Sequence, residues 1–155
     1  LPEAAEQVRK LGQDHRAYPT RILLLGYAAA AAFFTAFYGG TLLDTLCGGL
    51  CGLAVGLWML WASPRLRFNN LFQTLIGAAI ASLLALILVH MGIGGQLEAI
   101  TIGTLMVLVP GMALTNAMRA IMAGDLFSGL SRTAESILTA TAIALGVMVS
   151  LAIGN

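Results

Sequence analysis

Charged residues are scarce in this sequence: Asp, Glu, Lys and Arg make up only 10% of its 155 residues. A soluble domain carries about 25%, so this chain has too little charge to cover a surface that faces water. The net charge of +1 excludes the strongly basic field of nucleic-acid-binding proteins. Hydrophobic residues instead account for 59% of the chain, and the mean hydropathy is +0.90. These proportions predict a membrane protein.

Several chemical signatures are also missing. The two cysteines, Cys47 and Cys51, lie within an apolar run without histidine or further cysteine nearby, which favours buried thiols over metal ligands. There is no phosphate-binding loop and no HExxH motif, so ATP-driven transport is not encoded in this chain. The start of the chain lacks the apolar core of a signal peptide, so none is expected. Catalysis would need a His, Cys or carboxylate pair that faces a cavity, whereas His90 stands at a predicted helix end and is expected at the membrane interface. We expect no enzyme activity, cofactor or metal.

Long apolar runs fill most of the chain. A membrane-spanning helix needs about 20 mainly apolar residues. Five segments approach this length: residues 22–38, 42–61, 71–91, about 97–118 and about 127–153. Five such segments leave no polar faces for a soluble surface, so we predict an all-α, polytopic bundle of five transmembrane helices over residues 19–155. Residues 1–18 are polar, and we expect a helical prefix or linker that follows a soluble region.

The basic residues are confined to one side of this predicted bundle. They precede the first segment or follow the second and the fourth: Arg9, Lys10, Arg16, Arg21, Arg65, Arg67, Arg119 and Arg132. The alternate loops, residues 39–40 and 92–96, contain neither Lys nor Arg. Because basic loops remain cytoplasmic, the pattern predicts a multi-pass protein of the cytoplasmic (inner) membrane. Its N-terminus is expected inside and its C-terminus outside.

Small residues recur at helical spacing in two of the segments. In the second, Gly48, Gly52 and Gly56 are four apart, and such a stripe allows a neighbouring helix backbone to approach closely. The third segment carries a similar stripe of Gly77, Ala81 and Ala85. Asp44 stands at the start of the glycine stripe. Two interpretations of Asp44 remain open, a solvated helix start and an ion site.

The fourth segment is interrupted by Pro110 and Gly111. Proline removes a backbone hydrogen bond and clashes with the preceding turn, so we predict a broken helix. A break near the middle of the membrane exposes carbonyl groups and a half-helix N-terminus, as in many secondary transporters. The new N-terminus would favour an anionic group such as a carboxylate. Thr115, Asn116 and Arg119 follow within about one turn and are predicted to share a face.

The fifth segment carries charge where the others carry almost none. We use the name polar stripe for the residues that step by three or four along it: Arg132, Glu135, Thr139, Ala142, Gly146 and Ser150. Charge at membrane depth costs at least ~2.5 kcal/mol per residue, so it persists where it is paired or functional. Arg132 and Glu135 can pair along the helix. Glu135 is also the better candidate for a proton-exchanging group, because it lies deeper than Asp125.

The loop before the fifth segment has a simpler interpretation. Gly124 and Asp125 suit a helix C-cap followed by an N-cap, and Asp125 could pair with Arg119. The charged residues here could be only a cytoplasmic loop that determines topology, but Glu135 and Thr139 continue into the apolar span. We therefore predict a substrate or ion pathway. Its residues are Pro110, Gly111, Thr115, Asn116, Arg119, Asp125, Arg132, Glu135 and Thr139, with Asp44 and Ser128 as further candidates.

The segment PGMALTNAMRAIMAGDLFSGLSRTAESILTATAIALG, residues 110–146, resembles the signature of the threonine/serine exporter (ThrE-like) family. The dense match covers about a quarter of the chain, and the five-segment layout agrees over nearly all the rest. One departure is Ala120, which stands where many members carry an acidic residue.

The resemblance implies export of small hydroxy amino acids, driven by the proton gradient. It also implies a companion, which is a smaller hydrophobic subunit or a fused second half, and hetero- or homo-oligomers. Related two-component systems export dicarboxylates such as succinate, which is the first alternative. The second is a non-transporting membrane scaffold or assembly subunit, in which the polar stripe is only a helix–helix contact.

Overall fold

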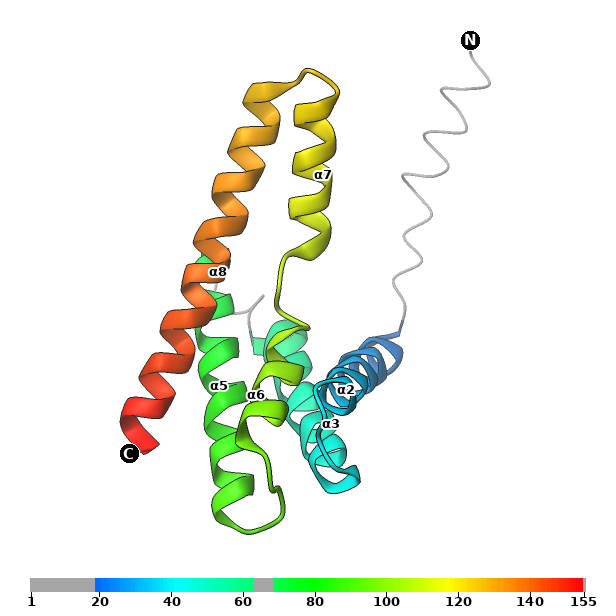
Figure 1. Ribbon diagram of the computed structural model, residues 1–155, viewed down its shortest axis with the longest axis vertical. Coiled ribbons are helices and arrows are strands. Elements are labelled where there is room, and N and C mark those ends of the chain that lie inside the picture. Colours follow the sequence, from blue (N-terminus) through cyan, green and yellow to red (C-terminus); the bar gives the residue numbers. More distant parts are fainter. Residues whose placement is uncertain (1–18, 63–68, 155) are drawn as a thin grey trace.

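The computed structural model describes residues 19–62 and 69–154, and these ranges are helical apart from short turns and one longer break (Figure 1). The helices are α2 (Thr20–Phe37), α3 (Leu42–Leu57), the π-helical turn η1 (Trp58–Ala62), α5 (Asn70–His90), α6 (Leu97–Leu105), α7 (Gly111–Met122) and α8 (Leu126–Gly154). The described part contains no strand, so the all-α prediction is confirmed. The polar prefix, the basic residues at 65 and 67, and Asn155 lie outside the described residues.

Four of the described helical segments are long and apolar enough to cross a membrane: Thr20–Phe37, Leu42–Trp61, Asn70–His90 and Leu126–Gly154. The remaining predicted segment is divided into α6 and α7, as expected for a broken fourth helix. The break is longer than the sequence indicated and comprises residues 106–110. Pro110 directly precedes α7 as its N-cap residue, where the missing proline N–H is tolerated.

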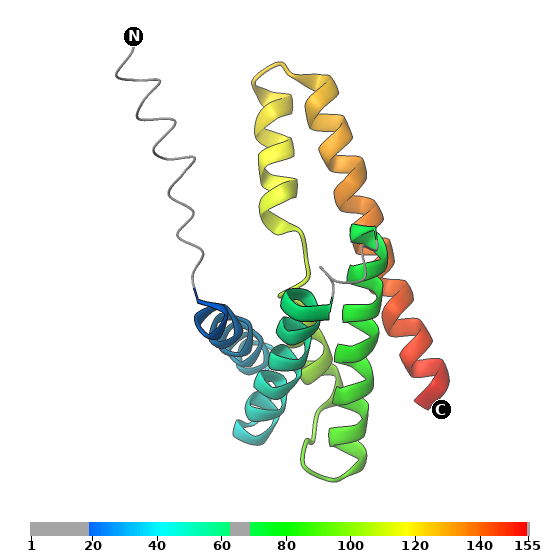
Figure 2. The ribbon, with the colours of Figure 1, turned by 180° about the vertical axis from the view of Figure 1, so that it is seen from behind.

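The helices form two groups, α2, α3 and α6 on one side and α7 and α8 on the other, and α5 lies between them (Figures 1 and 2). Helix α2 packs along α3, α6 contacts α2, α3 and α5, and α8 packs along α5. Gly146 of α8 approaches Leu75 and Ala78 of α5, and Gly154 approaches Leu86 farther along. Both contacts advance in the same direction, so α5 and α8 run parallel.

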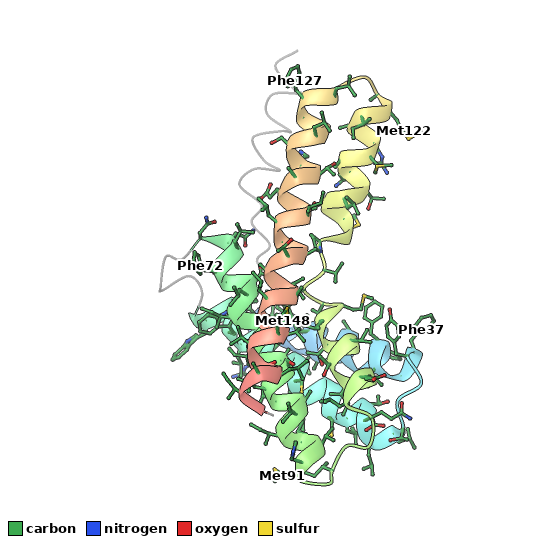
Figure 3. The ribbon with its side chains drawn as sticks, turned by 60° about the vertical axis from the view of Figure 1, so that its left-hand side comes forward. Phe37, Phe72, Met91, Met122, Phe127 and Met148 are labelled. Carbon is green, nitrogen blue, oxygen red and sulfur yellow. The ribbon has the colours of Figure 1, made fainter. Side chains whose placement is uncertain are left out.

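Helix α7 packs mainly on α8, and the two form a hairpin that projects beyond the other helices (Figures 1 and 2). Met122 and Phe127 stand at its tip, at the opposite end of the molecule from Met91 (Figure 3). The 29 residues of α8 span roughly 43 Å at about 1.5 Å per residue. This exceeds the ~30 Å hydrocarbon core of a bilayer, so α8 is long enough to cross it and extend beyond.

The turn of this hairpin has the caps that the sequence predicts. Gly124 has a φ of +91°, which glycine adopts without steric cost. The Asp125 N–H donates to the carbonyl of Ala120 at 3.0 Å and the Gly124 N–H to that of Ile121, the pattern of a glycine-terminated helix. The Asp125 carboxylate then accepts from the Ser128 N–H at 3.2 Å and caps α8.

Asp44 joins two turns at the other end of the molecule. One carboxylate oxygen accepts from the N–H and the hydroxyl of Thr41, at 2.9 and 2.8 Å. The other accepts from the N–H groups of Gly95 and Gln96, at 2.6 and 3.3 Å. Asp44 stands in the first turn of α3 and forms a capping box with Thr41, so the predicted helix start is confirmed. It is 0% exposed, so the predicted solvation is wrong. The carboxylate holds the α2–α3 turn to the α5–α6 loop.

We expect Asp44→Asn to destabilise the protein by about 2 kcal/mol, because an amide offers one acceptor oxygen and leaves buried N–H groups unpaired. The measurement is thermal unfolding of the detergent-purified protein by circular dichroism. Glu98→Gln is the matched control, since Glu98 is exposed on α6 and its side chain makes no hydrogen bond in the part of the chain that the structure describes. Equal melting temperatures for the two variants would contradict this role.

The glycine stripe of α3 is the contact surface for α2. A methyl group added at Gly52 would lie 2.5 Å from the Cβ of Ala31 and 2.7 Å from the carbonyl oxygen of Tyr27. One added at Gly49, off the stripe, would lie 3.5 Å from the Cβ of Ala32, an ordinary contact. The predicted packing role of the stripe therefore has a direct geometric basis.

These two glycines form a matched pair for a stability test. Gly52→Ala is expected to destabilise by about 1–3 kcal/mol through overpacking. Gly49→Ala is expected to stabilise by up to ~1 kcal/mol, because alanine favours helix. Thermal unfolding of both variants checks this. The same sign of change for both would contradict the close approach of α2 and α3.

Candidate substrate cavity

A cavity of about 560 Å³ opens where α5 and α7 begin. Its walls come from α2, η1, α5, the break before α7, α7 itself and α8. The lining residues are Tyr27, Met59, Asn70, Thr74, Val107, Leu108, Pro110, Ala113, Arg132, Glu135, Ser136 and Thr139. Pockets for small ligands commonly measure about 300–1,000 Å³, so the cavity is large enough for a small metabolite.

Among the residues that the structure describes, Arg132 and Glu135 are the only charged residues in this lining. The described part of the chain contains no ion pair, so the predicted pairs Arg132–Glu135 and Arg119–Asp125 are not formed. Both cavity side chains remain accessible to solvent. The guanidinium and the carboxylate are therefore available to groups of opposite charge that enter the cavity.

The serine and threonine hydroxyl groups of the lining each donate their hydrogen atom to a backbone carbonyl. Thr74 donates to the carbonyl of Asn70, Ser136 to that of Arg132 and Thr139 to that of Glu135, each at 2.9 Å. A hydroxyl oxygen that donates once can still accept. These three groups therefore offer acceptors to the donors of a ligand, such as an ammonium group.

The ends of three helices meet at the cavity. Asn70 begins α5 and Ala113 lies in the first turn of α7, while Val107 and Leu108 follow the last turn of α6. The N-cap residues of α5 and α7 make no side-chain capping bond. Helix N-termini attract anions and C-termini attract cations. The break thus adds partial charges of both signs to the cavity wall.

The structure divides the predicted pathway residues. Pro110, Arg132, Glu135 and Thr139 line the cavity, and Gly111 begins α7 beside it. The rest lie elsewhere: Thr115, Asn116 and Arg119 are exposed on α7, Asp125 and Ser128 form the hairpin turn, and Asp44 is buried at the opposite end.

Sequence reasoning missed four polar lining residues, Tyr27, Asn70, Thr74 and Ser136. Asn70 and Thr74 are four apart at the start of an apolar segment, and this spacing could have indicated a shared polar face. Ser136 follows Glu135 directly. Tyr27 carried no local signal, because its role depends on where α2 packs.

A bundle of long apolar helices around a polar cavity beside a broken helix defines a membrane transport protein. The family model described as "Putative threonine/serine exporter" (ThrE) matches residues 1–154. The chain belongs to this threonine/serine exporter family. The resemblance stated from the signature at residues 110–146 is confirmed over nearly the whole sequence.

The chain is also similar to a protein of Mycobacterium tuberculosis named "Probable threonine/serine exporter", with 26% identity over 152 residues. This alignment covers 97% of the chain and 28% of the relative. The chain therefore spans less than a third of the length of that curated relative. No solved structure matches the chain.

Proposed function

We propose that this chain forms the substrate-binding part of a secondary transporter that exports threonine, serine and similar small amino acids. The cavity is its cytoplasmic entrance. The observation that carries the proposal is the charge balance of the described lining residues, one arginine and one glutamate among hydroxyl acceptors. A zwitterionic amino acid has one group for each: its carboxylate binds Arg132, and its ammonium binds Glu135.

The same balance disfavours the dicarboxylate alternative. A molecule such as succinate would bring two negative charges to one guanidinium, and Glu135 would repel the second charge. The scaffold alternative is also disfavoured. Arg132 and Glu135 do not pack in a helix–helix contact but border a cavity that a small molecule can enter.

Proton coupling and assembly belong to the same proposal. Glu135 is accessible to water and lies next to bound substrate, so it can exchange a proton during the cycle. The aligned region is only 28% of the relative, which leaves room for the proposed second membrane part, fused or separate, that completes the exporter. The exposed apolar side chains of the hairpin, including Met122 at 85% and Phe127 at 91%, would face that part or lipid.

The proposed orientation places the cavity and the hairpin inside and the Asp44 turns outside. Ile93, in the α5–α6 loop, and Ala123, in the hairpin turn, are both exposed and suit cysteine labelling, because the native Cys47 and Cys51 are buried. We expect a membrane-impermeant maleimide to label Ile93→Cys in intact cells. Ala123→Cys should react only after permeabilisation, and labelling of both from outside would contradict the orientation.

Counterflow in proteoliposomes tests the function. The complete gene product is reconstituted and loaded with unlabelled threonine, serine or succinate. Entry of labelled threonine is expected with the two amino acids and not with succinate. Labelled succinate is tested in the same vesicles. Entry of labelled succinate into succinate-loaded vesicles without entry of labelled threonine would support the dicarboxylate alternative, and no entry of either label would support the scaffold.

A further inference from the structure

The contact between α5 and α8 closes the polar stripe beyond the cavity. A Cβ added to Gly146 would collide with the carbonyl oxygen of Leu75 and lie 2.9 Å from the Cβ of Ala78. Farther along, a Cβ at Gly154 would lie 2.6 Å from a methyl of Leu86. The two helices are in direct contact here, so a molecule in the cavity cannot pass between them unless they separate.

Ser82 lies within this contact. It is one turn beyond Ala78 and one turn before Leu86, and both of these residues touch α8. Residues four apart share a helix face, so Ser82 also faces α8. It is 0% exposed, and its hydroxyl has no hydrogen-bond partner in the described structure. Thr101 on α6 is the other residue with such an oxygen.

The Ser82 hydroxyl contributes no hydrogen bond to the contact between α5 and α8. A buried polar group without a partner destabilises the folded state, and such groups in native proteins call for an explanation. Ser150, on the facing stripe of α8, is also 0% exposed, but its hydroxyl donates to the carbonyl of Val147 at 2.8 Å. Alanine at position 82 would fill the same contact without the unpaired oxygen.

We infer that the α5–α8 contact is the translocation gate, and that Ser82 binds the substrate after it passes Ala78 and Gly146. The inference rests on the proposed function. When α8 separates from α5, the Ser82 hydroxyl meets the ammonium or hydroxyl group of a small amino acid, and its missing hydrogen bond is made. The substrate then binds at two successive positions along the polar stripe. The first is the cavity before the gate, and the second lies beyond the gate, between Ser150 of the stripe and Ser82 of α5.

Ser82→Ala in the complete gene product tests this inference. Export is measured as the rate of threonine uptake into inside-out vesicles. This rate is expected to fall about tenfold, the effect of one hydrogen bond to a charged group. The melting temperature should equal or exceed that of the wild type, because an unpaired buried hydroxyl is removed. Calorimetric binding of threonine to the purified protein should be unchanged, since the cavity is intact.

Thr35→Val is the control for removal of a buried hydroxyl away from the gate. Thr35 is 0% exposed and donates to the carbonyl of Ala31 at 2.8 Å, so its loss should leave export near the wild-type rate. Wild-type export by Ser82→Ala would overturn the inference and leave the proposed function standing. A lower melting temperature would also overturn it, because the hydroxyl would then be bonded in the folded state. Absence of threonine export by the wild type would instead refute the proposed function.

Discussion

Glu135→Gln is expected to abolish the accumulation of threonine that a pH gradient drives into inside-out vesicles. A glutamine cannot take up or release a proton, so the gradient no longer acts on this position. Exchange of labelled for unlabelled threonine should persist at saturating substrate, because exchange needs no net proton movement. Its half-saturation concentration should rise about tenfold, since the amide oxygen binds an ammonium group less strongly than a carboxylate does.

The control for this prediction is Glu98→Gln, the same chemical change on an exposed residue in the first turn of α6. Glu98 does not line the cavity. The control variant should leave accumulation and exchange unchanged. If Glu135→Gln still accumulates threonine at the normal rate, Glu135 carries no coupling proton. A parallel loss of exchange at saturating substrate would assign Glu135 to substrate binding alone.

Arg132→Gln is expected to raise the half-saturation concentrations for threonine and serine transport about 10- to 100-fold. This change corresponds to the loss of one charge-assisted hydrogen bond to the substrate. Arg132→Lys should retain part of the affinity, because it keeps the charge but not the planar, two-donor geometry. Arg119→Gln is the matched control, since Arg119 is exposed on α7 and does not line the cavity.

A substrate analogue isolates the carboxylate contact. Threonine amide lacks the negative charge, so it should compete weakly with threonine in the wild type. In Arg132→Gln the two compounds should compete almost equally, because the group that distinguishes them is gone. Unchanged discrimination in the variant would show that another donor, such as the N-terminus of α7, binds the carboxylate.

The sequence by itself determined the class of this protein. Low charge and long apolar runs left no soluble alternative, because helices of this composition can only be buried in lipid or in each other. Local chemistry was equally readable where its causes are local. Pro110 predicted the break, Gly124 and Asp125 predicted the hairpin caps, and the spacing of the glycines on α3 predicted a close helix contact.

Only the tertiary structure decided which polar residues meet. Arg132, Glu135 and Thr139 lie beside Asn70 and Thr74 because α8 runs parallel to α5 with Gly146 against Ala78, an alignment that no short segment encodes. The same packing leaves Arg119 exposed on the projecting hairpin.

Asp44 shows the same limit. Its buried carboxylate accepts hydrogen bonds from the N–H groups of Gly95 and Gln96, more than fifty residues away in sequence. Helix periodicity shows which residues share a face of one helix. The neighbour of that face depends on how the helices pack in three dimensions, and the cavity exists only through that packing.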